Sequence, residues 1–141
     1  MTLADAIRLG SAQHPQAFGG YYEHNGGDVT AVCAVGAAML VWGIFHTRTG
    51  KLRRPSVVED HVHEVFAHYD LFKARGSACP QVGCEAFLNT RLCLIAHLND
   101  DHKWSREAIA DWLDEHRDGV PCVDGATPNV QHLKTKARRA A

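Results

Sequence analysis

Apolar side chains recur every three or four positions along much of the chain, and this spacing predicts helices. It is clearest from Val57 to about Lys73. The apolar positions of this segment are Val58, Val62, Val65, Phe66, Tyr69 and Phe72. We expect Ser56 to cap the helix and Glu59 to complete a capping box. Period-two alternation, which is typical of half-buried strands, is nearly absent from the chain.

Four further segments fit helices. Thr2 and Asp5 form a capping box for a helix that ends at Gly10, and an apolar helix is expected over 30–43. Another helix is expected from Glu85 or Asn89 to Leu98. We expect Ser105 to cap the last helix and Gly119 and Pro121 to end it. The predicted buried stripe of this helix consists of Ile109, Trp112, Leu113 and His116. The pattern predicts an all-α fold, a compact bundle of about five helices.

Glycine and proline divide these helices. The pairs Gly19-Gly20 and Gly26-Gly27 bracket Tyr21 and Tyr22, which predicts a loop whose aromatic rings fold back on the core. Cys79 and Cys84 bound another tight loop, which contains a proline and a glycine. Loops of this kind often carry the functional residues of a domain.

The length and composition fit one soluble domain. The chain has 141 residues, of which 45% are hydrophobic and 22% are charged. We expect a single domain over 1–124 and a basic, flexible tail over 125–141. The formal net charge is -1, so no overall positive field attracts nucleic acid. The basic stretch Lys51–Arg54 is too short to change that conclusion.

The segment 29–47 has no Asp, Glu, Lys or Arg and approaches the length of a membrane span. It is rich in Ala and Gly and includes Thr30 and His46, which favours a buried helix over membrane insertion. The N-terminus shows no pattern of a secretory signal. We therefore expect a cytoplasmic protein in which closely spaced cysteines bind metal rather than form disulfides.

Two cysteines and two histidines have the spacing of a metal site. Four residues separate Cys79 from Cys84, twelve separate Cys84 from His97, and four separate His97 from His102. A short turn can bring two thiolates to one side of an ion while a helix brings two imidazoles to the other, which completes a tetrahedron. We predict a structural Zn²⁺ bound by these four side chains.

The segment 79–102 resembles a two-cysteine, two-histidine zinc finger, although the sequence shows no strand pair before the helix. The positions that would contact bases are occupied by Thr90, Leu92, Cys93 and Ala96. These residues are small or apolar, whereas bases are usually recognised by Arg, Lys, Asn or Gln. Nucleic-acid binding through this segment therefore stays a weaker alternative to a structural role.

Cys93 is an alternative fourth ligand. It lies four residues before His97, so both would project from one face of a helix and could join Cys79 and Cys84 in a three-sulfur site. His102 would then be free. We prefer His102 because Cys93 lies in the apolar stretch Leu92–Ile95, where a cysteine is commonly part of the core.

A cysteine-dependent hydrolase is the main alternative function. Cys33 lies near the start of the central helix, whose dipole would lower the pKa of its thiol. His97 and either Asn99 or Asp100 would complete the catalytic group. Because Cys33 is flanked by small apolar residues, a buried structural position is the preferred interpretation.

The helix over 57–73 is rich in histidine. His61, Glu64 and His68 share a face at spacings of three and four, and His63 lies beside them. Such a face could hold a second metal or transfer a proton. A solvated helix face is the simpler interpretation.

The runs 33–38 and 97–113 (CAVGAA and HLNDDHKWSREAIADWL) resemble small uncharacterised proteins of bacteria and phages. The resemblance implies a bacterial or phage setting and no activity. Together these observations predict a zinc-stabilised protein-interaction or accessory module without catalysis. Its protein partner is not identified by the sequence, and homo-oligomerisation is left open.

Overall fold

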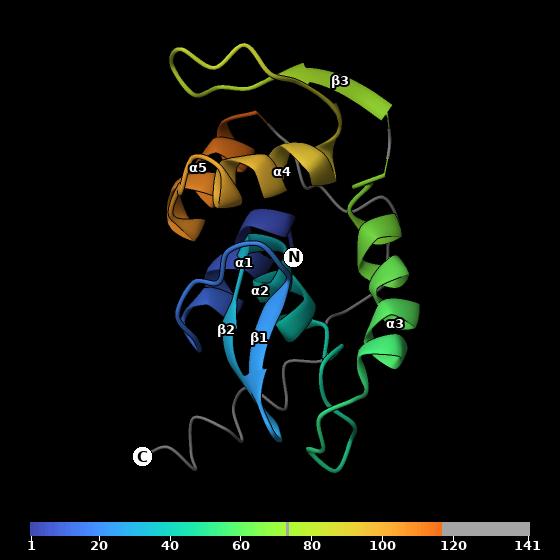
Figure 1. Cartoon of the computed structure of the whole chain (residues 1–141). Helices are drawn as coiled ribbons and strands as arrows, with labels where there is room; N and C mark the ends of the chain where they lie inside the picture. The colour runs from blue at the N-terminus through green and yellow to red at the C-terminus, as the bar shows by residue number, and fades with distance from the viewer. Residues whose placement is uncertain (73, 117–141) are drawn as a thin grey trace.

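The computed structural model of the chain describes residues 1–72 and 74–116. The elements in chain order are α1 (Leu3–Ser11), β1 (Tyr22–Asn25), β2 (Asp28–Val32), α2 (Ala34–Val41), α3 (Pro55–His68), β3 (Ala74–Ala78), β4 (Phe87–Thr90), α4 (Arg91–Asp100) and α5 (Arg106–Glu115). Figure 1 shows α1 and α2 at the centre, α3 along one side, and α4 and α5 beneath the β3 hairpin. The predicted end of the last helix at Gly119 and Pro121 and the predicted tail over 125–141 lie outside the described residues.

The prediction of an all-α fold is wrong, because the protein also contains strands. They form two antiparallel two-stranded sheets, β1 with β2 and β3 with β4. In the first hairpin, Asn25 pairs with Asp28 across the glycine pair that the sequence analysis assigned to a loop. Glycine pairs of this kind also suit the tight turn of a hairpin. The strands are only four or five residues long, so their alternation is too brief to stand out from the sequence.

The central apolar helix begins later than predicted. Residues 28–32 form β2 instead of the first turn of the helix, since their backbone pairs with β1. Cys33 is the N-cap of α2, and its sulfur accepts a hydrogen bond from the Gly36 N–H at 3.3 Å. Every residue of α2 is buried. Across the described ranges, no helix combines the length and apolar character needed to cross a membrane.

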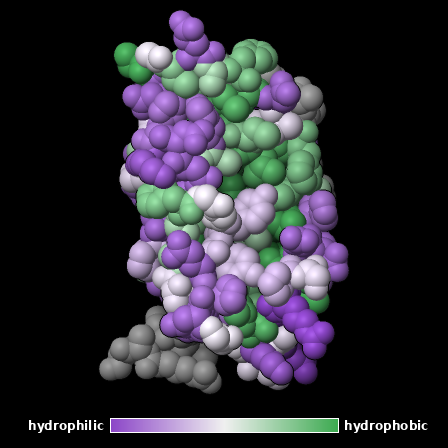
Figure 2. All heavy atoms as spheres, in the orientation of Figure 1, coloured by the Kyte–Doolittle hydropathy of each residue, from purple (hydrophilic) through white to green (hydrophobic). Residues whose placement is uncertain are grey.

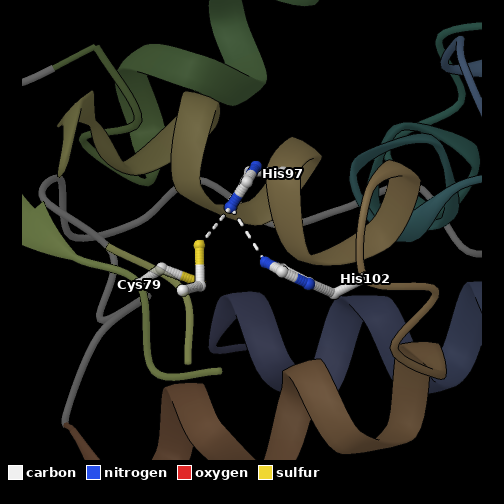
Figure 3. Close-up of side chains that lie close together, drawn as sticks. Cys79, His97 and His102 are labelled. Atoms are coloured by element: carbon white, nitrogen blue, oxygen red, sulfur yellow. Dashed lines mark hydrogen bonds between the residues drawn. The ribbon is translucent and has the colours of Figure 1, made fainter. Parts of the chain in front are cut away.

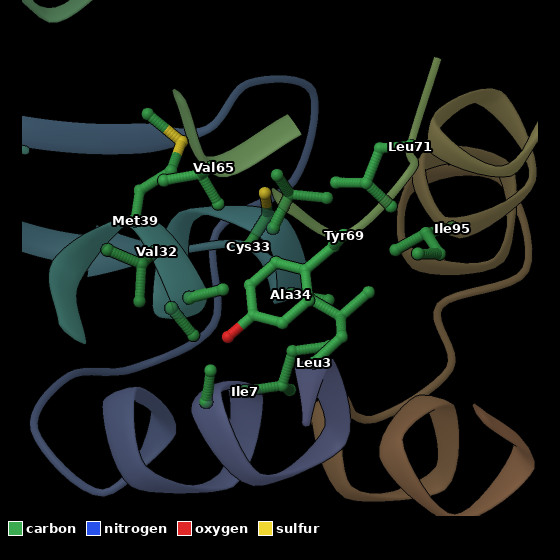
Figure 4. Packing of buried hydrophobic residues seen from close by; sticks show 14 of the residues in the cluster. Leu3, Ile7, Val32, Cys33, Ala34, Met39, Val65, Tyr69, Leu71 and Ile95 are labelled. Carbon is green, nitrogen blue, oxygen red and sulfur yellow. The ribbon is translucent and has the colours of Figure 1, made fainter. Parts of the chain in front are cut away.

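The hydrophobic core surrounds α2 (Figure 4). Leu3 and Ile7 of α1 are fully buried in it, and so is Met39 of α2. The predicted capping box of Thr2 and Asp5 is confirmed, with both of its hydrogen bonds present. The α1 helix therefore has a satisfied N-terminus and one apolar face, both of which favour its packing on α2.

The α3 helix adds a second layer to this core. Its predicted apolar positions are buried, except that Phe72 lies beyond the helix and is 49% exposed. The predicted Ser56 cap is wrong: Arg54 is the N-cap and Pro55 is the first helical residue. Proline suits that position because its fixed φ is helical and the missing N–H would have no partner there.

Two arginine side chains connect α5 with α1 and with the loop that follows α1. Arg106 of α5 donates hydrogen bonds to four backbone carbonyls, those of Ser11, His14, Pro15 and Val32. Arg8 of α1 contacts three carboxylates of α5, those of Glu107, Asp111 and Asp114. The predicted Ser105 cap of α5 is confirmed, but His116 is exposed and does not belong to the buried stripe.

Candidate metal centre

The two cysteines lie in the loop of the β3–β4 hairpin. Cys79 directly follows β3, and its N–H donates to the Ala86 carbonyl at 3.1 Å, which extends the pairing beyond the strands. Cys84 closes a turn by donating to the Gln81 carbonyl at 3.1 Å. Gly83 has a φ of +82°, a conformation that residues with a side chain rarely adopt. The hairpin thus supplies the strand pair that the sequence did not reveal.

The two histidines come from the end of α4. Thr90 caps this helix by accepting a hydrogen bond from the Cys93 N–H, and His97 lies in the last turn. His102 follows the helix, and its N–H donates to the His97 carbonyl. Lys103 then adopts a positive φ of 56°, which turns the chain toward α5. Strand, strand and helix therefore occur in the order known from two-cysteine, two-histidine zinc fingers.

The structure brings the four side chains predicted as ligands close together. Figure 3 labels three of them, Cys79, His97 and His102. Their ligand atoms all lie within 4.8 Å of one another. The Cys84 Sγ is 3.4 Å from the His97 Nε2, which is 3.0 Å from the His102 Nε2. Zinc bond lengths place neighbouring ligand atoms of a tetrahedron about 3.3–3.8 Å apart. The group is therefore close enough to bind a metal ion.

A carboxylate orients one of the imidazoles. The Nδ1 of His97 lies 2.6 Å from the Oδ2 of Asp101. When Nδ1–H donates to this carboxylate, the Nε2 lone pair faces the cluster, as metal-bound histidines require. The sequence analysis did not single out Asp101, although an acidic residue four positions after a helical histidine was an available signal.

The cluster also shifts the pKa values of its own members. The Ala86 N–H, His97 and His102 stabilise the Cys84 thiolate and lower its pKa to about 6. Cys84 and then Asp101 raise the pKa of His97 by favouring its protonated form. Burial raises the pKa of Cys79. The thiolate is the form of cysteine that binds a metal, so the lowered pKa favours metal binding by Cys84 at neutral pH.

Trp104 joins the cysteine loop to the rest of the domain. Its indole Nε1–H donates to the Gln81 Oε1 at 2.6 Å, and its backbone N–H donates to the Leu98 carbonyl at 3.0 Å. The tryptophan thus connects the loop between the two cysteines to the end of α4. This contact positions the thiols opposite the histidines.

Cys93 lies outside the cluster. Its side chain is exposed on α4, whereas the ligand atoms of Cys79, Cys84, His97 and His102 converge. The i, i+4 spacing of Cys93 and His97 is therefore not enough to bring the thiol to the other sulfurs. The three-sulfur alternative lacks structural support.

The structure does not assemble the alternative catalytic group. Both ring nitrogens of His97 contact groups other than Cys33, namely Asp101 on one side and the cluster on the other. Asn99 is buried and uses its amide to hold the backbone around Ala17 and Ala34. The predicted lowering of the Cys33 pKa is wrong, because burial raises it to about 11. A protonated thiol at neutral pH is a poor nucleophile.

The histidines of α3 separate into different environments. His61 lies 3.7 Å from Glu64 at the surface, whereas His68 is buried against the ring of Trp42 at a centroid distance of 4.6 Å. His63 contacts Phe72 instead. Within 1–72 and 74–116, the four-residue cluster is the one group of this kind that could hold a metal.

No protein-family model matches the chain, and no curated protein or solved structure matches it either. The resemblance of 33–38 and 97–113 to small bacterial and phage proteins therefore stays a prediction. The proposed function therefore rests on the geometry of the metal centre.

Proposed function

We propose that the protein is a zinc-stabilised interaction or accessory module, in which Cys79, Cys84, His97 and His102 bind one structural Zn²⁺. The convergence of two thiols and two imidazole Nε2 atoms within 4.8 Å carries this proposal. Two sulfur and two nitrogen ligands in a tetrahedral arrangement favour Zn²⁺ over oxygen-seeking ions such as Mg²⁺ and Ca²⁺.

The ligand number favours a structural metal over a catalytic one. Catalytic zinc sites usually have three protein ligands and leave a position for water or substrate. Here four side chains are available, and Asp101 occupies the outer nitrogen of His97. When bound, the ion would join the β3–β4 loop to the end of α4 and neutralise the two thiolates.

Exposed apolar side chains near the centre support an interaction role. Val82, between the two cysteines, is 93% exposed, and Phe87 of β4 is 67% exposed. Figure 2 shows a hydrophobic area on the face drawn there, where the upper end of α3 approaches α4. Contiguous exposed apolar areas mark surfaces that bind other proteins.

The metal content of matched cysteine variants tests the proposal. We expect the purified protein to contain about one zinc per chain by elemental mass spectrometry, in line with a four-ligand site. Cys84→Ser should remove the metal and lower the melting temperature. Cys93→Ser makes the same chemical change on the exposed face of α4 and should leave both unchanged. Retention of zinc by Cys84→Ser, or its loss from Cys93→Ser, would contradict the proposed ligand set.

A further inference from the structure

A pocket separate from the metal cluster lies between the Gly19–Tyr21 loop, the start of α2 and α4. Its volume is about 310 Å³, and its apolar lining includes Val35, Ile95 and Ala96. Pockets that bind small molecules begin at about this size and combine apolar walls with few polar groups. None of the four metal-cluster residues lines it.

Close contact between the loop and α2 builds one wall. A Cβ atom at Gly36 would lie 1.9 Å from the Tyr21 carbonyl oxygen, so only glycine allows the loop backbone to approach this far. The Cys33 N–H donates to the same carbonyl at 3.1 Å. Tyr21, whose ring lies 5.8 Å from that of Phe66, is 37% exposed and is one of the residues that line the pocket. The pocket therefore has one wall built on a fixed backbone.

Asp100 is held in the pocket by the groups around it. Its Oδ1 accepts hydrogen bonds from the Gly19 N–H at 2.9 Å and from the Asn99 amide at 2.7 Å. Asn99 is 1% exposed and donates its other amide hydrogen to the Ala17 carbonyl, so its own donors are used within the protein. These contacts fix the position of the carboxylate through one of its two oxygens.

The charge of the pocket selects the kind of ligand. Among the described residues that line it, Asp100 is the one that carries a charge, and within the described chain it forms no ion pair. Lys103 lies nearby in sequence, but its ammonium group is placed over the Phe18 ring at 4.5 Å. A carboxylate beside apolar and aromatic walls complements a cation on an apolar chain.

We propose that this pocket binds a primary alkylammonium group on a short apolar stem. The stem packs against Tyr21 and Ala96, the lining residues with accessible apolar surface, and the ammonium group pairs with Asp100. The same chemistry is offered by a free alkylamine and by a lysine side chain of a partner protein. The proposal does not rest on the metal, since the pocket and the cluster share no residue.

Titration of the zinc-loaded protein with n-butylammonium tests the proposal. Two-dimensional ¹H–¹⁵N NMR should show saturable shifts at the amides of 19–21 and 95–100. The uncharged 1-butanol has the same stem and should bind more weakly. Asp100→Asn keeps an acceptor for the Gly19 N–H but loses the charge, and should weaken binding about threefold to fivefold, as expected for a partly exposed ion pair. Asp60→Asn, a matched change on the exposed face of α3, should have no effect.

Two further measurements complete the test. Ala96→Phe should fill the pocket and abolish the shifts, with the dispersion of the spectrum showing that the variant is folded. Nα-acetyl-lysine methylamide separates the two sources: tighter binding than n-butylammonium supports a partner lysine, and equal or weaker binding supports a free amine. The proposal is overturned if no saturable shift occurs, if 1-butanol binds equally well, or if Asp100→Asn binds as wild type. Such a result would leave the zinc content, and therefore the proposed metal site, unaffected.

Discussion

The helical core and the β3–β4 hairpin of this protein are held together by different interactions. Every residue of α2 is buried, and large apolar side chains of α1 and α4 lie in the same core. In β4, by contrast, Phe87 and Asn89 are exposed and their neighbours are only half-buried. The hairpin loop reaches the end of α4 through the group of two thiols and two imidazoles and through the Gln81–Trp104 hydrogen bond.

This difference indicates where a metal would contribute stability. Burial of apolar area stabilises the core at about 25 cal/mol per Å², with no need for an ion. A short hairpin with a mostly exposed outer face is at best marginally stable alone. We therefore expect the metal to order the hairpin residues 79–90, while the helical core, which includes Leu94, Ile95 and Leu98 of α4, depends on packing.

Removal of the metal should have the largest effect, and the effect should be local. After treatment with a chelator, amide hydrogen exchange in 79–90 should rise by roughly a hundredfold or more, because zinc contributes about 10–16 kcal/mol in isolated finger peptides. Amides of α2 should keep most of their protection. Hydrogen-exchange mass spectrometry measures both regions in one experiment.

The outcome separates two views of the fold. Equal loss of protection in α2 and in 79–90 would show that the core also depends on the metal. Chelator treatment of Cys84→Ser, which is expected to hold no metal, is the control and should change neither region.

Substitution of either of two arginines, Arg106 or Arg8, should change the free energy of unfolding by an intermediate amount. Arg106→Gln removes charged hydrogen bonds to four partly buried carbonyls and should lower the free energy of unfolding by about 2–4 kcal/mol. Arg8→Gln removes three exposed ion pairs and should cost about 1 kcal/mol or less. Urea unfolding at low and high salt measures both.

Salt distinguishes the two arginines further. The cost of Arg8→Gln should shrink at high salt, because exposed charges are screened. The cost of Arg106→Gln should persist, since it comes mainly from the Ser11 and His14 carbonyls that lose a charged donor, whereas the Pro15 and Val32 carbonyls also accept backbone hydrogen bonds. An equal and equally salt-sensitive cost for both variants would contradict the structural role assigned to Arg106.

The two regions also differ in how well the sequence predicted them. Local signals correctly located two helix N-termini but not that of α3: Thr2 with Asp5 and Ser105 act through residues three positions away, and both caps are present, whereas Ser56 is not a cap. The spacing of cysteines and histidines likewise led to the four residues that lie within 4.8 Å of one another. In both cases the relevant partners are close in sequence or follow a fixed chemical pattern.

The strands could not be predicted in the same way. The β2 strand lies within a continuous apolar run that also fits a helix, and only its pairing with β1 decides between the two. The close contact between Gly36 and the Tyr21 carbonyl, which builds one wall of the pocket, depends on the tertiary fold. The periodicity of a helix or strand does not predict such a contact. Asp101 acts on His97 within one turn, so a search for carboxylates beside predicted ligands would have found it.

The smallest effect concerns pH and the buried histidine of α3. Burial lowers the pKa of His68, which is 6% exposed and stacks on Trp42 and Tyr69. The unfolded chain, with a histidine pKa of about 6.5, then binds the proton more tightly than the folded protein. Above about pH 6.5 His68 is neutral in both states and costs no stability. As the pH falls from there toward the lower folded-state pKa of His68, the free energy of unfolding decreases.

The variant His68→Phe keeps an aromatic ring between Trp42 and Tyr69 but cannot be protonated. Between pH 7.5 and about 5, its free energy of unfolding should fall less than that of wild type. His63→Phe is the matched control, because His63 is exposed on the same helix and should leave the pH dependence as it is. Parallel plots of unfolding free energy against pH for wild type and His68→Phe would mean that acid destabilises the protein at another site. The metal-binding segment would then be the region to test next, because its cysteines and histidines must lose protons to bind the ion.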